Sequence, residues 1–102
     1  MARVKRSPEA DEDIIGIWIH IANDDPLAAD GVLDYLDQQF ELIADNPKMG
    51  RVREELWPHA YCFNVGRAGW RSQYLVFYHI TEEGIEVARV LEGHRDITPD
   101  WF

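Results

Sequence analysis

The side chains that could perform chemistry are mostly cations in the second half of the chain. A general acid or base beside several arginines can cleave RNA, because the cations stabilise the pentavalent phosphate while the acid or base moves a proton. The candidates for this chemistry are Arg51, Arg53, Arg67, Arg71, Arg89, His94 and Arg95. The simpler interpretation is that they are scattered and form local ion pairs with Glu54, Glu55 and Glu92. Both interpretations stay open at this point.

Other reactive residue types lack the spacing that their chemistry requires. The four histidines are far apart in the sequence and Cys62 is the only cysteine, so we expect no metal site. Cys62 alternates within a strand pattern, which favours a small core residue over a nucleophile. Gly66 and Gly69 flank a turn between strands and do not form a phosphate-binding loop. The sequence therefore predicts no cofactor and no catalytic residue of these classes.

Length and charge limit the class of protein. The chain has 102 residues, 46% of them hydrophobic, so we expect one domain over residues 1–102 with a real core. Its net charge of −9 argues against strong direct binding to nucleic acid or anionic lipid. The apolar runs are far shorter than the roughly 18 residues of a membrane span. With no signal peptide expected after Met1 and a single cysteine, the chain should be cytoplasmic.

Two helices are predicted in the first half of the chain. Ser7-Pro8 and Asp25-Pro26 each place a capping side chain before a proline, and Asn46-Pro47 ends the second helix. Apolar residues recur at helical spacing in both segments. They are Ala10, Ile14, Ile17, Trp18 and Ile21, then Ala29, Leu33, Leu36, Phe40 and Ile43. Because only three residues separate the two patterns, we expect an antiparallel helical hairpin.

After Pro47 the apolar spacing changes to two, which is typical of strands. We expect strands over 61–65, 73–80 and 85–91, joined as a meander, with a hairpin turn at 81–84. Residues 3–6 could add a strand at a sheet edge. The order β-α-α-β-β-β indicates an α+β fold, in which the helical hairpin packs on one face of a small, mainly antiparallel sheet.

Acidic residues concentrate in the predicted helical hairpin. Residues 7–46 contain eleven Asp and Glu and no Lys or Arg, whereas residues 47–102 contain eight acids and seven bases. One stripe of the second helix carries Asp30, Asp34, Asp37, Glu41 and Asp45. This stripe is either a solvated face that keeps the protein soluble or a docking face for a basic partner segment.

Five segments together resemble the ParE toxins of the RelE/ParE toxin–antitoxin superfamily, which includes plasmid-stabilisation proteins. The segments are 7–14 with Ile17-Trp18, 44–51, 63–67, 75–78 and 84–96. They cover nearly the whole chain in the family's order, and the family's β-α-α-β-β-β plan agrees with the elements above. The chain departs from the family pattern at residues 68–73, where it carries extra residues that include Trp70 and Arg71.

The resemblance implies a small toxin that is encoded beside a ParD-type antitoxin. Such a toxin acts by binding DNA gyrase and has no catalytic residues of its own. The acidic charge favours this branch over the RelE-type relatives, because a nuclease that cuts messenger RNA on the ribosome must dock among phosphates. Two alternatives stay open: a ribosome-dependent endoribonuclease that uses His94-Arg95, and a non-toxic module that only binds its antitoxin.

The resemblance also implies two protein-binding surfaces. We expect the antitoxin to cover an apolar groove as a helix and an extended segment. Its candidate contacts are Tyr35, Leu42, Leu56, Trp57, Tyr61 and Phe63. We expect gyrase to contact the loop 66–73 and the segment 94–102, because Trp and Arg dominate protein interfaces. Its candidate contacts are Arg67, Trp70, Arg71, His94, Arg95, Trp101 and Phe102. The alternative for both sets is ordinary core packing.

Overall fold

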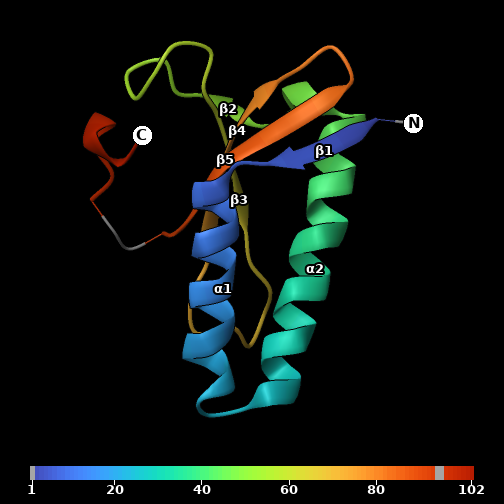
Figure 1. Cartoon of the computed structure of the whole chain (residues 1–102), viewed down its shortest axis with the longest axis vertical. Coiled ribbons are helices and arrows are strands. Elements are labelled where there is room, and N and C mark those ends of the chain that lie inside the picture. The colour runs from blue at the N-terminus through green and yellow to red at the C-terminus, as the bar shows by residue number, and fades with distance from the viewer. Residues whose placement is uncertain (1, 94–95) are drawn as a thin grey trace.

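Two antiparallel helices lie against one face of a five-stranded sheet in the computed structural model, which describes residues 2–93 and 96–102 (Figure 1). The helices are α1 (Pro8–Ala22) and α2 (Pro26–Asp45). The strands are β1 (Arg3–Arg6), β2 (Arg51–Val52), β3 (Tyr61–Val65), β4 (Tyr74–Ile80) and β5 (Gly84–Glu92). Short 3-10 helices follow at η1 (Pro47–Met49) and η2 (Pro99–Trp101). The predicted α+β fold, with its helical hairpin on one sheet face, is confirmed.

Both helices begin at the predicted caps. The Ser7 hydroxyl accepts a hydrogen bond from the Ala10 backbone N–H over 3.0 Å, and the Asp25 carboxylate accepts one from Ala28 over 3.1 Å. These bonds satisfy donors that the first helical turn leaves without partners. Local sequence signals therefore suffice to place the start of each helix.

The sheet order is β1-β5-β4-β3-β2, and all pairs are antiparallel except β1 with β5. The prediction of an edge strand at residues 3–6 is confirmed. Its approach to β5 requires Gly84, because a Cβ at that position would overlap the carbonyl oxygen of Arg3. β2 was not predicted, because a strand of two residues is too short to show a period.

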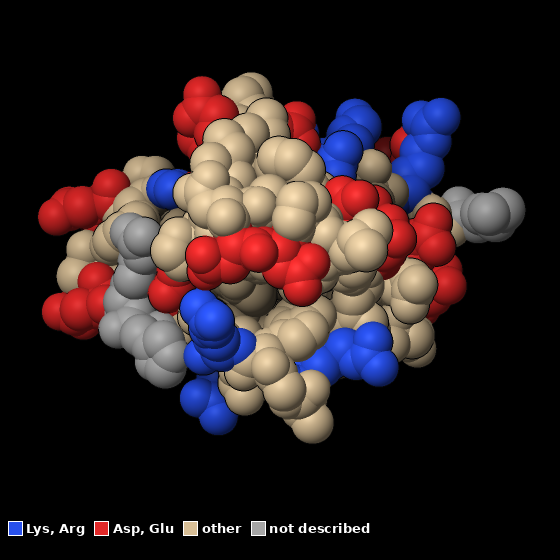
Figure 2. Space-filling view, turned by 90° about the horizontal axis from the view of Figure 1, so that it is seen from below, with Lys and Arg blue, Asp and Glu red and all other residues tan. Residues whose placement is uncertain are grey.

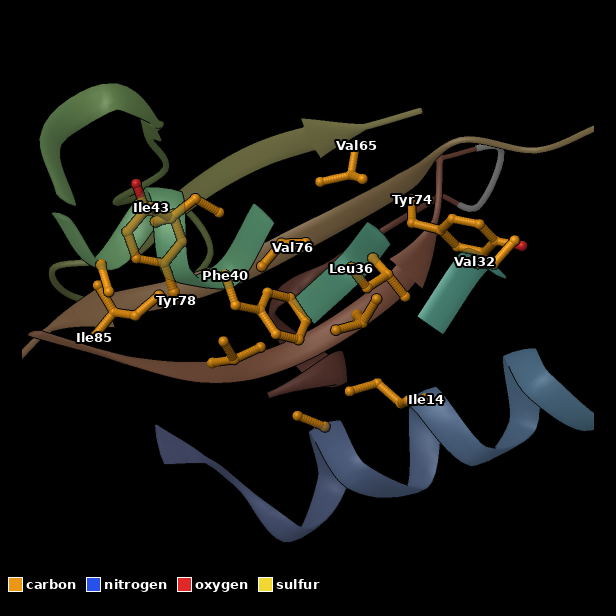
Figure 3. Close-up of a cluster of buried hydrophobic side chains, with 14 residues drawn as sticks. Ile14, Val32, Leu36, Phe40, Ile43, Val65, Tyr74, Val76, Tyr78 and Ile85 are labelled. Atoms are coloured by element: carbon orange, nitrogen blue, oxygen red, sulfur yellow. The ribbon is translucent and has the colours of Figure 1, made fainter. Parts of the chain in front are cut away.

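The main core fills the space between the helices and the sheet (Figure 3). Its largest fully buried side chains include Leu36 and Phe40 from α2 and Tyr78 from β4. The Tyr78 hydroxyl donates to the Pro47 carbonyl over 2.7 Å and accepts from the Gly50 N–H over 3.1 Å. Tyr78 thereby ties the segment after α2 to the sheet.

The opposite face of the sheet carries a second, smaller apolar cluster. Leu56, Cys62, Phe77 and Leu91 are buried there, with Trp57, Leu75, Ile97 and Trp101 packed around them. Burial raises the pKa of the Cys62 thiol to about 11, and the prediction of Cys62 as a core residue is confirmed. In the described part of the chain, loops and the C-terminal residues 96–102 cover this face, and no α-helix does. Among the described residues, no helix is long and apolar enough to cross a membrane.

Candidate functional site

The first cleft, here called the helix-tip cleft, lies between the α1–α2 turn and the β3–β4 loop. It has a volume of about 470 Å³. Ile21, Val32 and Tyr74 form part of its apolar lining. Its polar lining comes from His20, Asp24 and Asp25 on the helix side, and from Arg67, Arg71 and Ser72 on the loop side. Figure 2 shows acidic side chains on one side of the hollow and basic side chains on the other.

An aromatic group anchors the β3–β4 loop beside this cleft. The Trp70 ring makes edge contacts with Tyr35, at 5.4 Å between ring centroids, and with Tyr74, at 6.2 Å. The Arg67 guanidinium carbon lies 4.8 Å from the centroid of the Tyr35 ring, on its face. The loop turns at Gly69, whose φ of 92° favours glycine. Trp70 therefore packs against Tyr35 of α2 and Tyr74 of β4, while the rim of the cleft stays polar.

One exposed ion pair joins the two sides of the helix-tip cleft. Arg71 Nη1 lies 3.5 Å from Asp24 Oδ2, and the two side chains are 91% and 73% exposed. Pairs at this exposure contribute little to stability, because water solvates each charge almost as well as the partner does. A ligand or partner that offers its own charges can therefore separate Arg71 from Asp24 with little loss of folding stability.

The second cleft, here called the sheet-face cleft, lies over the smaller apolar cluster and has a volume of about 420 Å³. Its lining includes Trp57, His79, Glu86, Arg89, Trp101 and Phe102. Phe102 packs on Trp57 with 4.2 Å between ring centroids, and on Phe77 with 5.1 Å. His79 Nε2 lies 2.7 Å from Glu86 Oε1. The C-terminal aromatics thus dock on the sheet face and do not extend away from it.

A partly buried ion pair holds the wall of this second cleft. Arg89 Nε and Nη2 donate to Asp13 Oδ2 and Oδ1 over 2.7 and 2.8 Å, and both side chains are less than one fifth exposed. Hydrogen bonds to Asp13 raise the pKa of Arg89. Arg89 also donates to the Trp101 carbonyl, which links the pair to the C-terminal segment.

The Asp13 carboxylate also accepts a hydrogen bond from the backbone at an irregularity in β5. The pairing register moves from Phe77–Arg89 to Tyr78–Val87, so Ala88 is an extra residue, as in a β-bulge. Asp13 accepts a hydrogen bond from the Val90 N–H over 3.0 Å, and Ser7 donates to the Ala88 carbonyl over 2.7 Å. The bulge therefore depends on two side chains at the start of α1. Asp13 was not among the predicted site residues; its only sequence signal was an acid in the first turns of a helix.

The described arginines of the second half of the chain do not converge on one site. Arg67 and Arg71 lie at the helix-tip cleft, Arg89 lines the sheet-face cleft, and Arg53 bonds to Glu55 over 2.8 Å. His94 and Arg95 lie outside the described residues. No group of three or more His, Cys, Asp or Glu in the described part of the chain could hold a metal ion.

The predicted gyrase contacts divide between the two clefts. Arg67, Trp70 and Arg71 belong to the helix-tip cleft, whereas Trp101 and Phe102 belong to the sheet-face cleft. The assignment of these residues to gyrase stays a prediction.

The predicted antitoxin contacts do not form one continuous groove. Leu56 and Trp57 lie in the sheet-face cleft, and Leu56 is buried. Tyr35, Tyr61 and Phe63 pack at the margin of the main core, and Leu42 is exposed on α2. Their assignment to the antitoxin also stays a prediction.

Comparisons with known proteins place the chain in a family. The family model of the ParE toxin of the type II toxin–antitoxin system parDE matches residues 4–97. No curated protein sequence matches the chain. A solved structure described as the chromosomal ParDE toxin–antitoxin system from P. aeruginosa shares the fold, with a TM-score of 0.67 and 16% sequence identity. The match covers 90% of this chain and 96% of that one. This chain belongs to the ParE toxin family.

Proposed function

We propose that this protein is a cytoplasmic toxin that inhibits DNA gyrase by binding it, and that a ParD-like antitoxin neutralises it. The match of the ParE family model over residues 4–97 carries the proposal. The similar fold described as a ParDE system supports the pairing with a ParD-type partner.

The charge distribution supports binding over RNA cleavage. Among the described candidates for RNA cleavage, Arg53 and Arg89 form ion pairs with carboxylates of this chain. A phosphate-cleaving site needs cations directed at the substrate, and pairing with carboxylates removes much of their field. The net charge of −9 further opposes docking among RNA phosphates.

Within this proposal the helix-tip cleft is the main gyrase contact. It offers Arg67, Arg71 and the edge of Trp70 on one loop, and these residue types dominate the energy of protein interfaces. Trp101 and Phe102 form a second contact at the sheet-face cleft. Trp57, a predicted antitoxin contact, packs against Phe102 with the two rings tilted, so an antitoxin that binds Trp57 would also cover Phe102. This overlap offers a direct route to neutralisation.

The decisive experiment expresses the protein from a regulated promoter and assays gyrase supercoiling and message cleavage in parallel. Wild-type protein should inhibit supercoiling and leave messages intact. Trp70→Ala with Arg71→Ala should weaken inhibition at least about tenfold, as loss of interface hot spots does. Arg3→Ala removes the same charge at β1, away from both clefts, and should inhibit like wild type. Message cleavage with normal supercoiling would overturn the proposal.

A second variant tests the nuclease alternative directly. If His94 were a general acid or base, His94→Ala would abolish growth arrest while the protein stayed folded. The binding mechanism instead expects substantial toxicity in His94→Ala. Removal of residues 97–102 should weaken gyrase inhibition in the binding mechanism.

A further inference from the structure

The outward face of the helical hairpin carries large apolar side chains in water. Ile15 and Ile19 of α1 are 58% and 52% exposed, and Leu27 at the start of α2 is 83% exposed. Ile15 and Ile19 are one helical turn apart, so they lie on the same face of α1. Trp18, one residue before Ile19, donates a hydrogen bond from its indole N–H to the Asp30 carboxylate of α2 over 2.9 Å. This side of α1 therefore borders the Asp30 side of α2.

The neighbouring stripe of α2 is acidic over its whole length. Asp30, Asp34, Asp37 and Glu41 follow one another at spacings of three and four residues, which places them along one line of the helix. Arg6 pairs with Asp37 over 3.5 Å. No described cation lies within ion-pair distance of Asp34 or Glu41. The exposed Ile15 and Ile19 of α1 thus lie on the side that borders the α2 acids, two of which, Asp34 and Glu41, have no described cation at ion-pair distance.

We propose that this outer helix face, formed by Ile15, Trp18, Ile19, Asp34 and Glu41, is a docking surface for a basic amphipathic helix of a partner protein. The apolar side of such a helix would cover Ile15 and Ile19, and its Lys or Arg side chains would reach the α2 acids. A second copy of this chain would bring acid against acid. Anionic lipid and nucleic acid carry the same sign as the stripe, so they are repelled.

The test uses a defined probe. A fluorescein-labelled peptide of about 18 residues, long enough to form a helix, carries Leu at helical spacing and Lys elsewhere. One control peptide has Glu in place of Lys, and another has the same Leu and Lys in scrambled order. Fluorescence anisotropy with the full chain should detect the amphipathic Lys peptide, and the other two should bind at least about tenfold more weakly, because each lacks the matching charge or the apolar stripe.

Variants then locate the binding surface. Asp34→Asn with Glu41→Gln should weaken binding about fivefold, the sum expected for two exposed charge pairs. Glu54→Gln with Asp96→Asn removes the same charge from loops near the sheet and should change affinity less than about twofold. Ile15→Ser with Ile19→Ser should weaken binding about tenfold by removing apolar contact. Circular dichroism and thermal melting check that every variant folds.

Three outcomes would overturn the proposal. The double variant at Asp34 and Glu41 and the control variant at Glu54 and Asp96 could weaken binding equally, which would show that the peptide responds to net charge alone. The scrambled peptide could bind as well as the amphipathic one. Sedimentation could show a dimer that Ile15→Ser with Ile19→Ser converts to monomer, which would make the face a self-association surface. The surface is separate from both clefts, so gyrase inhibition by these variants should match wild type whichever result is obtained.

Discussion

The helix-tip cleft and the sheet-face cleft have similar volumes, about 470 and 420 Å³, but they are held together differently. Across the mouth of the helix-tip cleft, Arg71 and Asp24 meet at 3.5 Å in nearly full contact with water. In the wall of the sheet-face cleft, Arg89 and Asp13 form two short hydrogen bonds in a setting largely removed from water.

The difference shows that the same residue types serve opposite purposes in this small fold. Water competes for both charges of an exposed pair, so that pair yields to an incoming partner. The Asp13 carboxylate also completes the hydrogen bonding of the β5 bulge, so it cannot leave without loss of structure. The helix-tip cleft can therefore open its ion pair when a partner binds, whereas the Arg89–Asp13 pair makes one side of the sheet-face cleft a fixed wall.

The largest expected effect is at the fixed wall. Asp13→Ala should lower the free energy of unfolding by about 2–4 kcal/mol, because it leaves Arg89 and the Val90 N–H without their acceptor. Urea unfolding would measure it, and the melting temperature should fall by roughly 10 °C or more. Glu12→Ala, an exposed acid of the same helical turn, should change stability by less than about 0.5 kcal/mol. Equal effects of the two variants would contradict the distinction between the clefts.

The second prediction concerns the thiol beneath the sheet-face cleft. With its pKa raised to about 11 by burial, Cys62 should react with iodoacetamide at pH 8 on the order of 100-fold more slowly than in urea. The reaction rate should keep rising with pH up to about 11. Unfolding lowers the pKa of this thiol, so the unfolded state loses its proton first. The free energy of unfolding should therefore decrease as the pH rises from about 9 to 11. Similar rates in native buffer and in urea would show that the thiol is accessible.

A smaller effect is expected for the aromatic lining of the same cleft. Phe102→Ala removes ring contacts with Trp57 and Phe77 and should lower stability by about 1 kcal/mol. Phe102→Leu keeps most of the apolar area, so it should lower the free energy of unfolding by about half as much as Phe102→Ala does. Denaturant titrations of both variants would test this. If neither variant changes stability, the C-terminal segment does not contribute to the wall in solution.

The smallest effect is expected at the helix-tip cleft. Asp24→Asn should change stability by less than about 0.5 kcal/mol, because its pair with Arg71 is almost fully solvated. The free energy of unfolding of the wild-type protein should change by a similarly small amount in high salt, because salt screens exposed charge pairs. A loss above about 1 kcal/mol in Asp24→Asn would mean that both clefts are built as fixed walls.

Features carried by neighbouring residues were predictable from the sequence. Ser7-Pro8 and Asp25-Pro26 signal helix starts through one side chain and one missing N–H, and the alternation in 61–65 signals a strand. These signals fixed the element order, and the order limits the packing to one helical layer on one sheet.

Features that depend on distant residues were not predictable. The bulge at Ala88 requires Asp13, which lies 75 residues earlier in the chain and looked like an ordinary acid at a helix start. Segment 53–59 shows no period, and Leu56 is buried in a cluster with Cys62 and Phe77 on the second face of the sheet. The predicted contacts could be named by residue type. Their division between two clefts could not be predicted, because it depends on which distant residues pack together.

The parallel pairing of β1 with β5 also has a consequence for the order in which the protein is made. Residues 3–6 are synthesised about 80 residues before their partners at 84–87, which is roughly 4–16 s earlier at usual translation rates. Until then the helical hairpin has no complete sheet to cover its apolar side. The main core draws on residues from Ala10 to Val90, so it can close only after Val90 has been synthesised. The folded core therefore forms well after the helical hairpin has been synthesised, and this delay arises from chain topology alone.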